Sequence, residues 1–153
     1  MMNIKFCVSA VVLALIACAQ STDVFQPDLS ANTMTGRWYS PDQVEAGKRL
    51  FTGNCAICHG ANAQGTLEWK KTDANGNFPP PPLNGSAHAW HHSLAVLAEV
   101  IKDGGQPMGG IMPPFKQTLT DEQILALISG FQSYWDQQTY ETWLEIEQQS
   151  RTN

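Results

Sequence analysis

The feature that most limits the fold of this chain is a short run of two cysteines and a histidine. Cys55 and Cys58 lie three positions apart, and His59 follows directly. Two thiols at this spacing can each form a thioether to a vinyl group on the same porphyrin edge, and the next residue then offers an imidazole to the iron. The spacing therefore predicts one covalently bound haem, with Cys55 and Cys58 as its attachment points.

Three other uses of these cysteines stay open at this point. A disulfide suits an exported protein, although it gives the following histidine no role. A thioredoxin-like redox pair needs a preceding strand, whereas a helix is predicted before this motif. Zinc is the third alternative, and its four ligands would be Cys55, Cys58, His88 and His91, although the gap between the two pairs is longer than usual in zinc fingers.

The N-terminal residues predict export. Lys5 precedes an apolar run over Val8–Ala19, which is too short to cross a bilayer as a helix and has the layout of a signal peptide over residues 1–17. The end of this run resembles a bacterial lipobox, in which Cys18 would carry the lipid, and cleavage after Ala19 is the alternative. We therefore expect an exported protein in the bacterial periplasm, tethered to a membrane as a lipoprotein through Cys18.

The charge of the chain excludes one class of partner. Nine Lys and Arg side chains stand against 14 Asp and Glu, for a net charge of -5, and the densest basic spot is the pair Lys70 and Lys71. Nucleic-acid binders carry clustered basic residues, so no nucleic acid is expected as a partner. Removal of residues 1–17 would take away Lys5 alone among the charged side chains and leave the domain more acidic.

Helix caps and apolar spacing predict four helices. Ser40, Pro41 and Gln43 form a helix start, and that helix ends near residue 54. Apolar residues at helical spacing predict a second helix over about 87–103. A capping box at Thr120 opens a third, whose apolar face runs as far as Trp135. A weaker pattern over 140–147 predicts a short C-terminal helix, before residues 148–153 fray. No strand is predicted.

Composition then divides the chain into parts. Residues 18–36 lack periodicity and are rich in Ser, Thr, Asn and Asp, which predicts a linker. Residues 37–136 would form the haem domain, and 137–153 a helical extension. Within the domain, glycines and prolines make residues 60–85 a long loop that something other than secondary structure must organise.

From Ser40 to about Trp135 the sequence resembles class I, mono-haem c-type cytochromes, and small bacterial exported or lipoprotein cytochromes c above all. The motifs that carry the resemblance are CAICHG, PPLNG and MPPF, together with GRWYS before the first helix and AHAWHH after the proline-rich loop. The resemblance implies an all-α fold, a cytochrome c-like helical shell around one covalently bound haem. First and last helices would cross where Gly47 allows close approach, so that Gly47 and Phe51 meet the region of Phe131 and Trp135.

The same resemblance implies the iron ligands. His59 would bind the iron on one side and Met112 on the other, where the thioether of Met raises the reduction potential relative to two His ligands. Met108, four residues earlier in the same flexible segment, is the alternative. Met112 is favoured because the two prolines that follow it restrict the backbone beside the ligand.

The proline-rich loop would line the haem pocket. A carbonyl near Pro82 or Leu83 would accept the free ring N–H of His59 and raise the basicity of the imidazole, as such acceptors generally do. The side chain of Leu83 would exclude water. Both residues are therefore predicted as pocket residues.

Three further histidines have no assigned role. If residues 88–92 were helical, His88, His91 and His92 would face one way and could bind copper or zinc, or supply a second haem imidazole. The favoured interpretation is that they hydrogen-bond to the backbone and to the loop.

With two axial ligands no coordination position stays open, so the predicted function is one-electron transfer. We expect a monomeric carrier, not an enzyme, that exchanges electrons with donor and acceptor proteins in a respiratory or periplasmic chain. The alternatives are a haem c accessory subunit or domain of a larger oxidase or dehydrogenase, a ligand-binding haem protein and, less favoured, a Cys/His metal-binding module.

Overall fold

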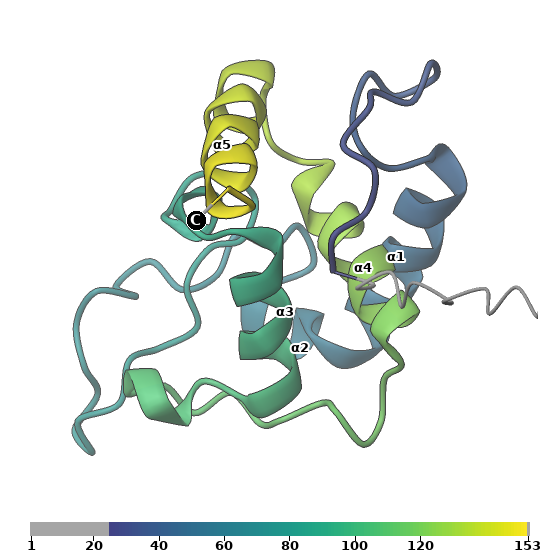
Figure 1. Ribbon diagram of the computed structural model, residues 1–153. Helices are drawn as coiled ribbons and strands as arrows, with labels where there is room; N and C mark the ends of the chain where they lie inside the picture. The colour runs from purple at the N-terminus through teal and green to yellow at the C-terminus, as the bar shows by residue number, and fades with distance from the viewer. Residues whose placement is uncertain (1–24, 153) are drawn as a thin grey trace, which may run out of the picture.

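The computed structural model describes residues 25–152, and over this range the chain is helical (Figure 1). The predicted signal peptide and Cys18 lie outside the described residues. The helices in chain order are α1 Pro41–Asn54, α2 Ala56–His59, η1 Ala89–His91, α3 Leu94–Asp103, η2 Gln106–Met108, α4 Asp121–Gln132 and α5 Gln137–Ser150. Between residues 25 and 152 the only β pairing is an isolated bridge between Phe78 and Gly110. No helix in this range is long and apolar enough to cross a membrane.

The two helices α1 and α4 cross in direct backbone contact (Figure 1). A Cβ atom on Gly47 of α1 would overlap the carbonyl oxygen of Ala126, and one on Gly130 of α4 would lie 2.7 Å from the carbonyl carbon of Gly47. The predicted crossing at Gly47 is therefore confirmed. Its partner is the stretch from Ala126 to Gly130, directly before the aromatic residues that the sequence suggested, while Phe51 shares the core with them.

Side-chain caps start both crossing helices as predicted. At α1 the Ser40 hydroxyl accepts a hydrogen bond from the Gln43 backbone N–H at 3.2 Å, and the Gln43 side chain accepts from the Ser40 N–H at 2.8 Å. Thr120 and Gln123 form the same pair of bonds at the start of α4. Each cap satisfies two backbone donors that the helix itself leaves unpaired.

The second predicted helix starts later than expected. The α-helix begins at Leu94, because the Ser93 hydroxyl accepts the Val96 N–H at 3.4 Å and His92 has extended backbone angles. Residues 89–91 form only a single 3₁₀ turn. The prediction of a helix from residue 87 was wrong, since a local cap interrupts the apolar pattern that suggested it.

The C-terminal helix is longer than expected, whereas α4 ends earlier. Trp135 lies in the turn after α4, and α5 then continues to Ser150. The predicted fraying from residue 148 was wrong, because hydrogen bonds of Glu147 hold the C-terminal end of α5 against the rest of the domain. Its carboxylate is 2% exposed and accepts hydrogen bonds from the Leu94 backbone N–H at 2.7 Å and from the Arg151 Nε at 2.8 Å.

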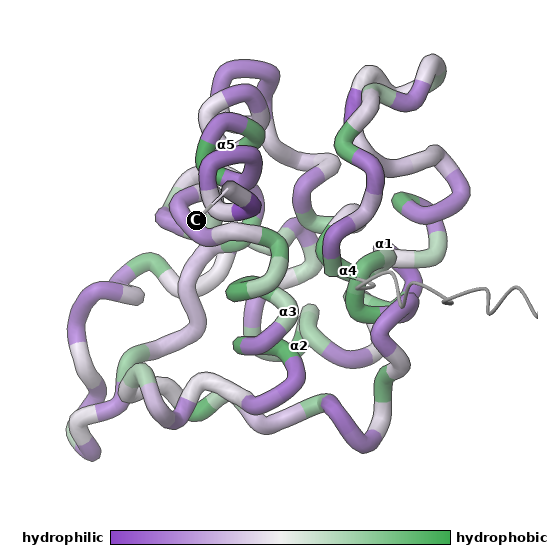
Figure 2. Tube along the Cα trace, viewed as in Figure 1, coloured by the Kyte–Doolittle hydropathy of each residue, from purple (hydrophilic) through white to green (hydrophobic). Residues whose placement is uncertain are grey.

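The core is rich in aromatic side chains that come from distant parts of the chain. Figure 2 shows hydrophobic, green stretches that alternate with hydrophilic, purple ones along the helices. The Trp38 indole N–H donates to the buried Gln132 side chain at 2.8 Å, and the Tyr140 hydroxyl accepts from the Trp38 backbone N–H at 2.9 Å. Before α1, Phe25 and Leu29 pack against this core, so α5 and the segment before α1 both belong to one packed body.

The helix crossing makes Gly47→Ala a severe change. The added methyl group would collide with backbone atoms of α4, which cannot rotate away as a side chain would, so α1 and α4 must separate. We expect the haem-loaded protein to lose about 1–3 kcal/mol of unfolding free energy or more. Denaturant titration followed by circular dichroism measures the loss.

Gly53→Ala is the matched control on the same helix. A Cβ atom there meets no atom within 4 Å and the residue is exposed. The variant should be as stable as the wild type or more stable by up to about 1 kcal/mol, because Ala favours the helix. Equal effects of the two substitutions would show that the crossing does not depend on Gly47.

Candidate haem-binding site

One turn of helix brings the two thiols and the imidazole together. Cys55 ends α1 through a hydrogen bond from its N–H to the Phe51 carbonyl at 2.9 Å, and its own carbonyl accepts from the N–H groups of Cys58 and His59 at 3.1 and 2.9 Å. Both cysteines are free thiols, with Cys55 buried and Cys58 exposed. Burial, followed by the proximity of Cys58, raises the pKa of Cys55 to about 11. No disulfide joins the two sulfur atoms, so both are available to form thioethers.

His59 is a buried imidazole with a fixed orientation. Its Nδ1 lies 2.9 Å from the carbonyl oxygen of Pro81, which can only accept, so Nδ1 carries the hydrogen and the lone pair is on Nε2. Burial lowers the pKa of His59, and the bond to Pro81 partly opposes this effect. A neutral imidazole with a free Nε2 is the form that binds a metal ion.

The acceptor lies one residue before the pair that the sequence suggested. Pro82 is buried, and Leu83 is half-buried against the core, where its N–H donates to the Ala63 carbonyl at 2.8 Å. The carbonyl of Leu83 has a different partner, the indole N–H of Trp135 at 2.8 Å. The contact between the proline-rich loop and the His59 ring is therefore made by the Pro81 carbonyl.

The two candidate methionines differ in their surroundings. Met112 is half-buried and packs against the core, whereas the side chain of Met108, on the short turn η2, is 54% exposed. The Met112 carbonyl accepts the Gly105 N–H at 3.0 Å, and a Cβ atom on Gly105 would lie 3.2 Å from the Met112 Cβ. Close packing against Gly105 therefore fixes the chain at Met112, whereas the Met108 N–H donates to the Gly105 carbonyl at 3.0 Å within its own short turn and leaves the side chain exposed.

The three extra histidines do not share one helix face. The His88 ring stacks on Trp69 with centroids 4.9 Å apart and meets the edge of His92 at 5.4 Å, while His91 packs against Trp90 at 3.7 Å. Between residues 25 and 152 no three His, Cys, Asp or Glu side chains are placed so that they could hold a metal ion. The zinc site with Cys55, Cys58, His88 and His91 is therefore not formed in the described chain.

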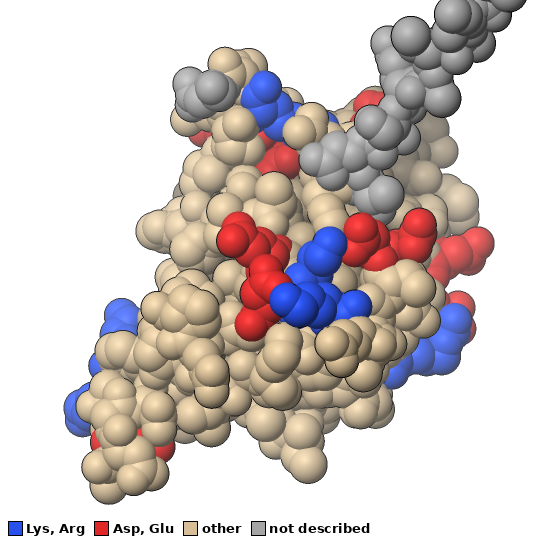
Figure 3. Space-filling view, turned by 60° about the horizontal axis from the view of Figure 1, so that its bottom comes forward, with Lys and Arg blue, Asp and Glu red and all other residues tan. Residues whose placement is uncertain are grey.

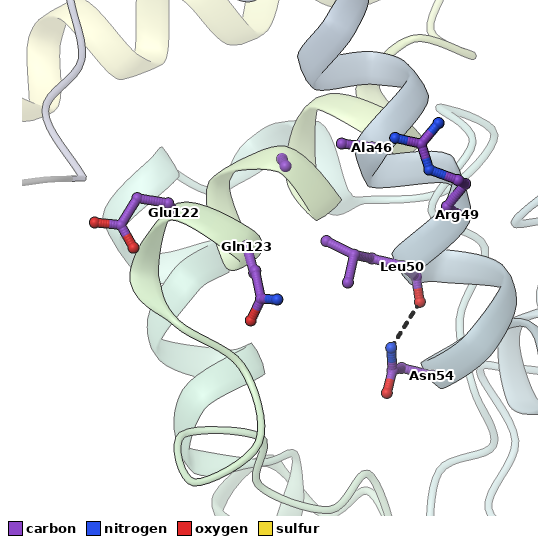
Figure 4. Close-up of a pocket in the computed structure, with 7 residues that line it drawn as sticks. Ala46, Arg49, Leu50, Asn54, Glu122 and Gln123 are labelled. Atoms are coloured by element: carbon purple, nitrogen blue, oxygen red, sulfur yellow. Dashed lines mark hydrogen bonds between the residues drawn. The ribbon is translucent and has the colours of Figure 1, made fainter.

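A surface pocket lies between α1 and α4. Figure 4 shows the polar and apolar side chains around it, among which the Asn54 side chain donates to the Leu50 carbonyl at 2.8 Å. The residues that line it are Ala46, Arg49, Leu50, Asn54, Glu122, Gln123 and Ala126. None of the residues predicted to hold haem belongs to this pocket.

The donor set fits a c-type haem. Cys55 and Cys58 offer two thiols at the attachment spacing, His59 offers a buried neutral imidazole with its Nε2 available, and Met112 offers a half-buried thioether. His and Met are the iron ligands of cytochromes c. Sequence reasoning missed the contribution of Trp135, which looked like one more apolar residue of a helix face. No local pattern marks a side chain whose partner is 52 residues away.

Comparison with known proteins supports this chemistry. Residues 42–129 match the family model "Cytochrome C oxidase, cbb3-type, subunit III". The chain is 32% identical over 95 residues to the cbb3-type cytochrome c oxidase subunit CcoP of Azospirillum sp. (strain B510), an alignment that covers 62% of this chain and 30% of that protein. It is 30% identical over 140 residues to the photosystem II extrinsic protein V of Porphyra purpurea, covering 77% of this chain and 82% of that protein.

Among solved structures, the crystal structure of cytochrome cL from the marine methylotrophic bacterium Methylophaga aminisulfidivorans MPT matches with a TM-score of 0.53. The match covers 94% of this chain and 88% of that one at 22% identity, and it confirms the cytochrome c-like, all-α fold. The chain therefore belongs to the cytochrome c oxidase cbb3-type subunit III family and is a c-type cytochrome domain with a single haem c.

Proposed function

We propose that this domain carries single electrons between proteins outside the cytoplasm, with Cys55 and Cys58 as the haem thioethers and His59 and Met112 as the axial ligands. The observation that carries the proposal is the bond from the His59 Nδ1–H to the Pro81 carbonyl, which leaves Nε2 for the iron. Haem iron, when bound, gains and loses one electron between its ferrous and ferric forms.

The roles of the chain follow from this ligand set. Pro81 keeps the imidazole in one orientation, and the half-buried Met112 supplies a soft ligand that favours the reduced iron. Two protein ligands leave no position for a substrate, which argues for a carrier over an enzyme. The burial of Met112 and the exposure of Met108 support Met112 as the ligand.

Exposed apolar side chains favour a docking surface next to the ligand residues. Ile57 lies within the attachment motif and is 93% exposed. Met108 and Ile111, which precede the predicted ligand Met112, are 54% and 58% exposed. Figure 3 shows a face on which Lys and Arg side chains gather beside Asp and Glu, with an uncharged area below them. Short-lived electron-transfer complexes use small surfaces of this kind, so we propose redox proteins as the partners.

A second candidate is a haem subunit of a larger complex. The family model and the CcoP relatives favour it, since those relatives are named as oxidase subunits, yet the chain spans only 30% of the length of the first of them. Purification from gently solubilised membranes of the native host distinguishes the two: co-purification at fixed stoichiometry with an oxidase or dehydrogenase supports the subunit, and isolation alone supports the carrier.

Met112→His tests the ligand assignment. An imidazole in place of the thioether keeps the iron six-coordinate but stabilises the ferric form, so we expect a lower reduction potential and loss of the weak far-red absorption band of Met-ligated ferric haem. Visible spectroscopy during redox titration measures both.

Met108→Leu is the matched control, because Met108 lies in the same segment but is exposed. This variant should keep the far-red band and the wild-type potential. Loss of the band in Met108→Leu, with the band intact in Met112→His, would transfer the ligand role to Met108.

We also propose that Cys18 carries a lipid that tethers the domain to a periplasmic membrane surface. Cys18→Ser, expressed in a bacterium that processes lipoproteins, should move the protein from the membrane fraction to the soluble periplasmic fraction, which immunoblotting of both fractions measures. Cys7→Ser, within the same signal region, should stay with the membrane. A Cys18→Ser protein that remains in the membrane fraction would contradict the tether.

A further inference from the structure

Trp135 links the end of α4 to the loop that faces His59. Its side chain is 2% exposed, and the indole N–H donates to the carbonyl of Leu83 at 2.8 Å. Leu83 lies two residues beyond Pro81, whose carbonyl accepts the His59 N–H. One indole therefore bonds to the same short segment that orients the predicted iron ligand.

The composition of this segment makes such bonds necessary. Residues 79–82 are all proline and have no backbone N–H, so the segment can be attached only through its carbonyl groups and through the residues that follow. The Pro80 carbonyl accepts the Thr66 N–H at 2.9 Å, and the Leu83 N–H donates to Ala63 at 2.8 Å. Both partners belong to the same long loop. The hydrogen bond from the Trp135 indole N–H to the Leu83 carbonyl connects this loop to the helical core.

The position of Trp135 is itself fixed from several sides. Its ring packs beside Phe131 with centroids 6.2 Å apart and meets Trp143 of α5 edge-on at 6.1 Å. A Cβ atom on Gly85, which has φ +94°, would lie 3.1 Å from the Cδ1 of Trp135. The indole thus has little room to move, and the loop closes tightly over it.

We propose that Trp135 is a positioning residue for His59: its N–H holds Leu83 so that the Pro81 carbonyl stays in place to accept the imidazole proton. The inference rests on the proposed function, in which His59 binds the iron. It gives Trp135 a role beyond packing, because removal of the N–H alone should loosen the bond between His59 and Pro81.

The test measures that bond directly in the haem-loaded protein. In reduced protein with ¹⁵N-labelled histidine, the exchange of the His59 Nδ1 proton with solvent is followed by NMR at constant pH. Trp135→Phe should speed this exchange about three- to tenfold, the factor expected from losing a hydrogen bond of ordinary net strength. The visible spectrum of the variant should remain that of six-coordinate haem.

Trp143→Phe is the matched control. Trp143 is also buried in the aromatic cluster, and its indole N–H also donates to a backbone carbonyl, that of His92 at 3.1 Å, but it does not bond to the proline segment. Phe at position 143 keeps an aromatic ring beside Trp135 and removes only the bond to His92, so the exchange should stay at the wild-type rate. Equal acceleration in both variants, or none in Trp135→Phe, would overturn the positioning role.

A Trp135→Phe variant that does not retain haem is replaced by protein carrying benzothienylalanine at position 135, in which sulfur takes the place of the indole N–H. The same acceleration is expected, and an unchanged rate overturns the inference. Failure of the proposed function has a different signature: a His59 that is not an iron ligand would show ring nitrogen shifts that titrate with pH in the wild-type protein.

Discussion

Backbone contact between α1 and α4 is the interaction on which the rest of the structure depends. Gly47 and Gly130 have no side chains at the crossing, so the two helices approach until their backbones touch. The haem-attachment motif follows α1 without a break, because the Cys55 N–H still bonds to Phe51 of that helix. Any change in how α1 lies on α4 therefore moves the thiols and His59 relative to the aromatic core.

The ligand loops are organised by individual hydrogen bonds and by close backbone packing, since they contain no regular secondary structure. Prolines cannot donate, and the proline segment is therefore attached through acceptor carbonyls to Thr66, His59 and Trp135. The Met112 segment is attached through the Gly105 N–H, which donates to the Met112 carbonyl at 3.0 Å, and a Cβ atom on Gly105 would lie only 3.2 Å from the Met112 Cβ. The positions of the Pro81 carbonyl and of Met112 therefore depend on hydrogen bonds to residues outside their own segments.

The helix after α4 extends this dependence to the C-terminus. Glu147 accepts the first N–H of α3, the Trp143 indole N–H donates to the carbonyl of His92, two residues before that helix, and the Trp143 ring packs against Trp135. Arg151, which pairs with Glu147, also donates to the Pro27 carbonyl at 2.8 Å. The C-terminal extension thus braces the start of α3, the segment before α1 and the tryptophan that holds the proline loop.

Local sequence determined much of this protein. The Ser40 and Thr120 caps set the starts of α1 and α4, and the spacing of Cys55, Cys58 and His59 indicated haem, because each depends on residues within a few positions of one another. The crossing at Gly47 was expected from the resemblance to cytochromes c, since its partners on α4 are distant in the sequence. Tertiary structure decided the rest: that Pro81 faces His59, that Met112 is half-buried while Met108 is exposed, that His88 contacts Trp69 and His92 while His91 packs against Trp90, and that Trp135 reaches Leu83. These outcomes depend on contacts between segments dozens of residues apart, where spacing along the chain carries no information about distance in space.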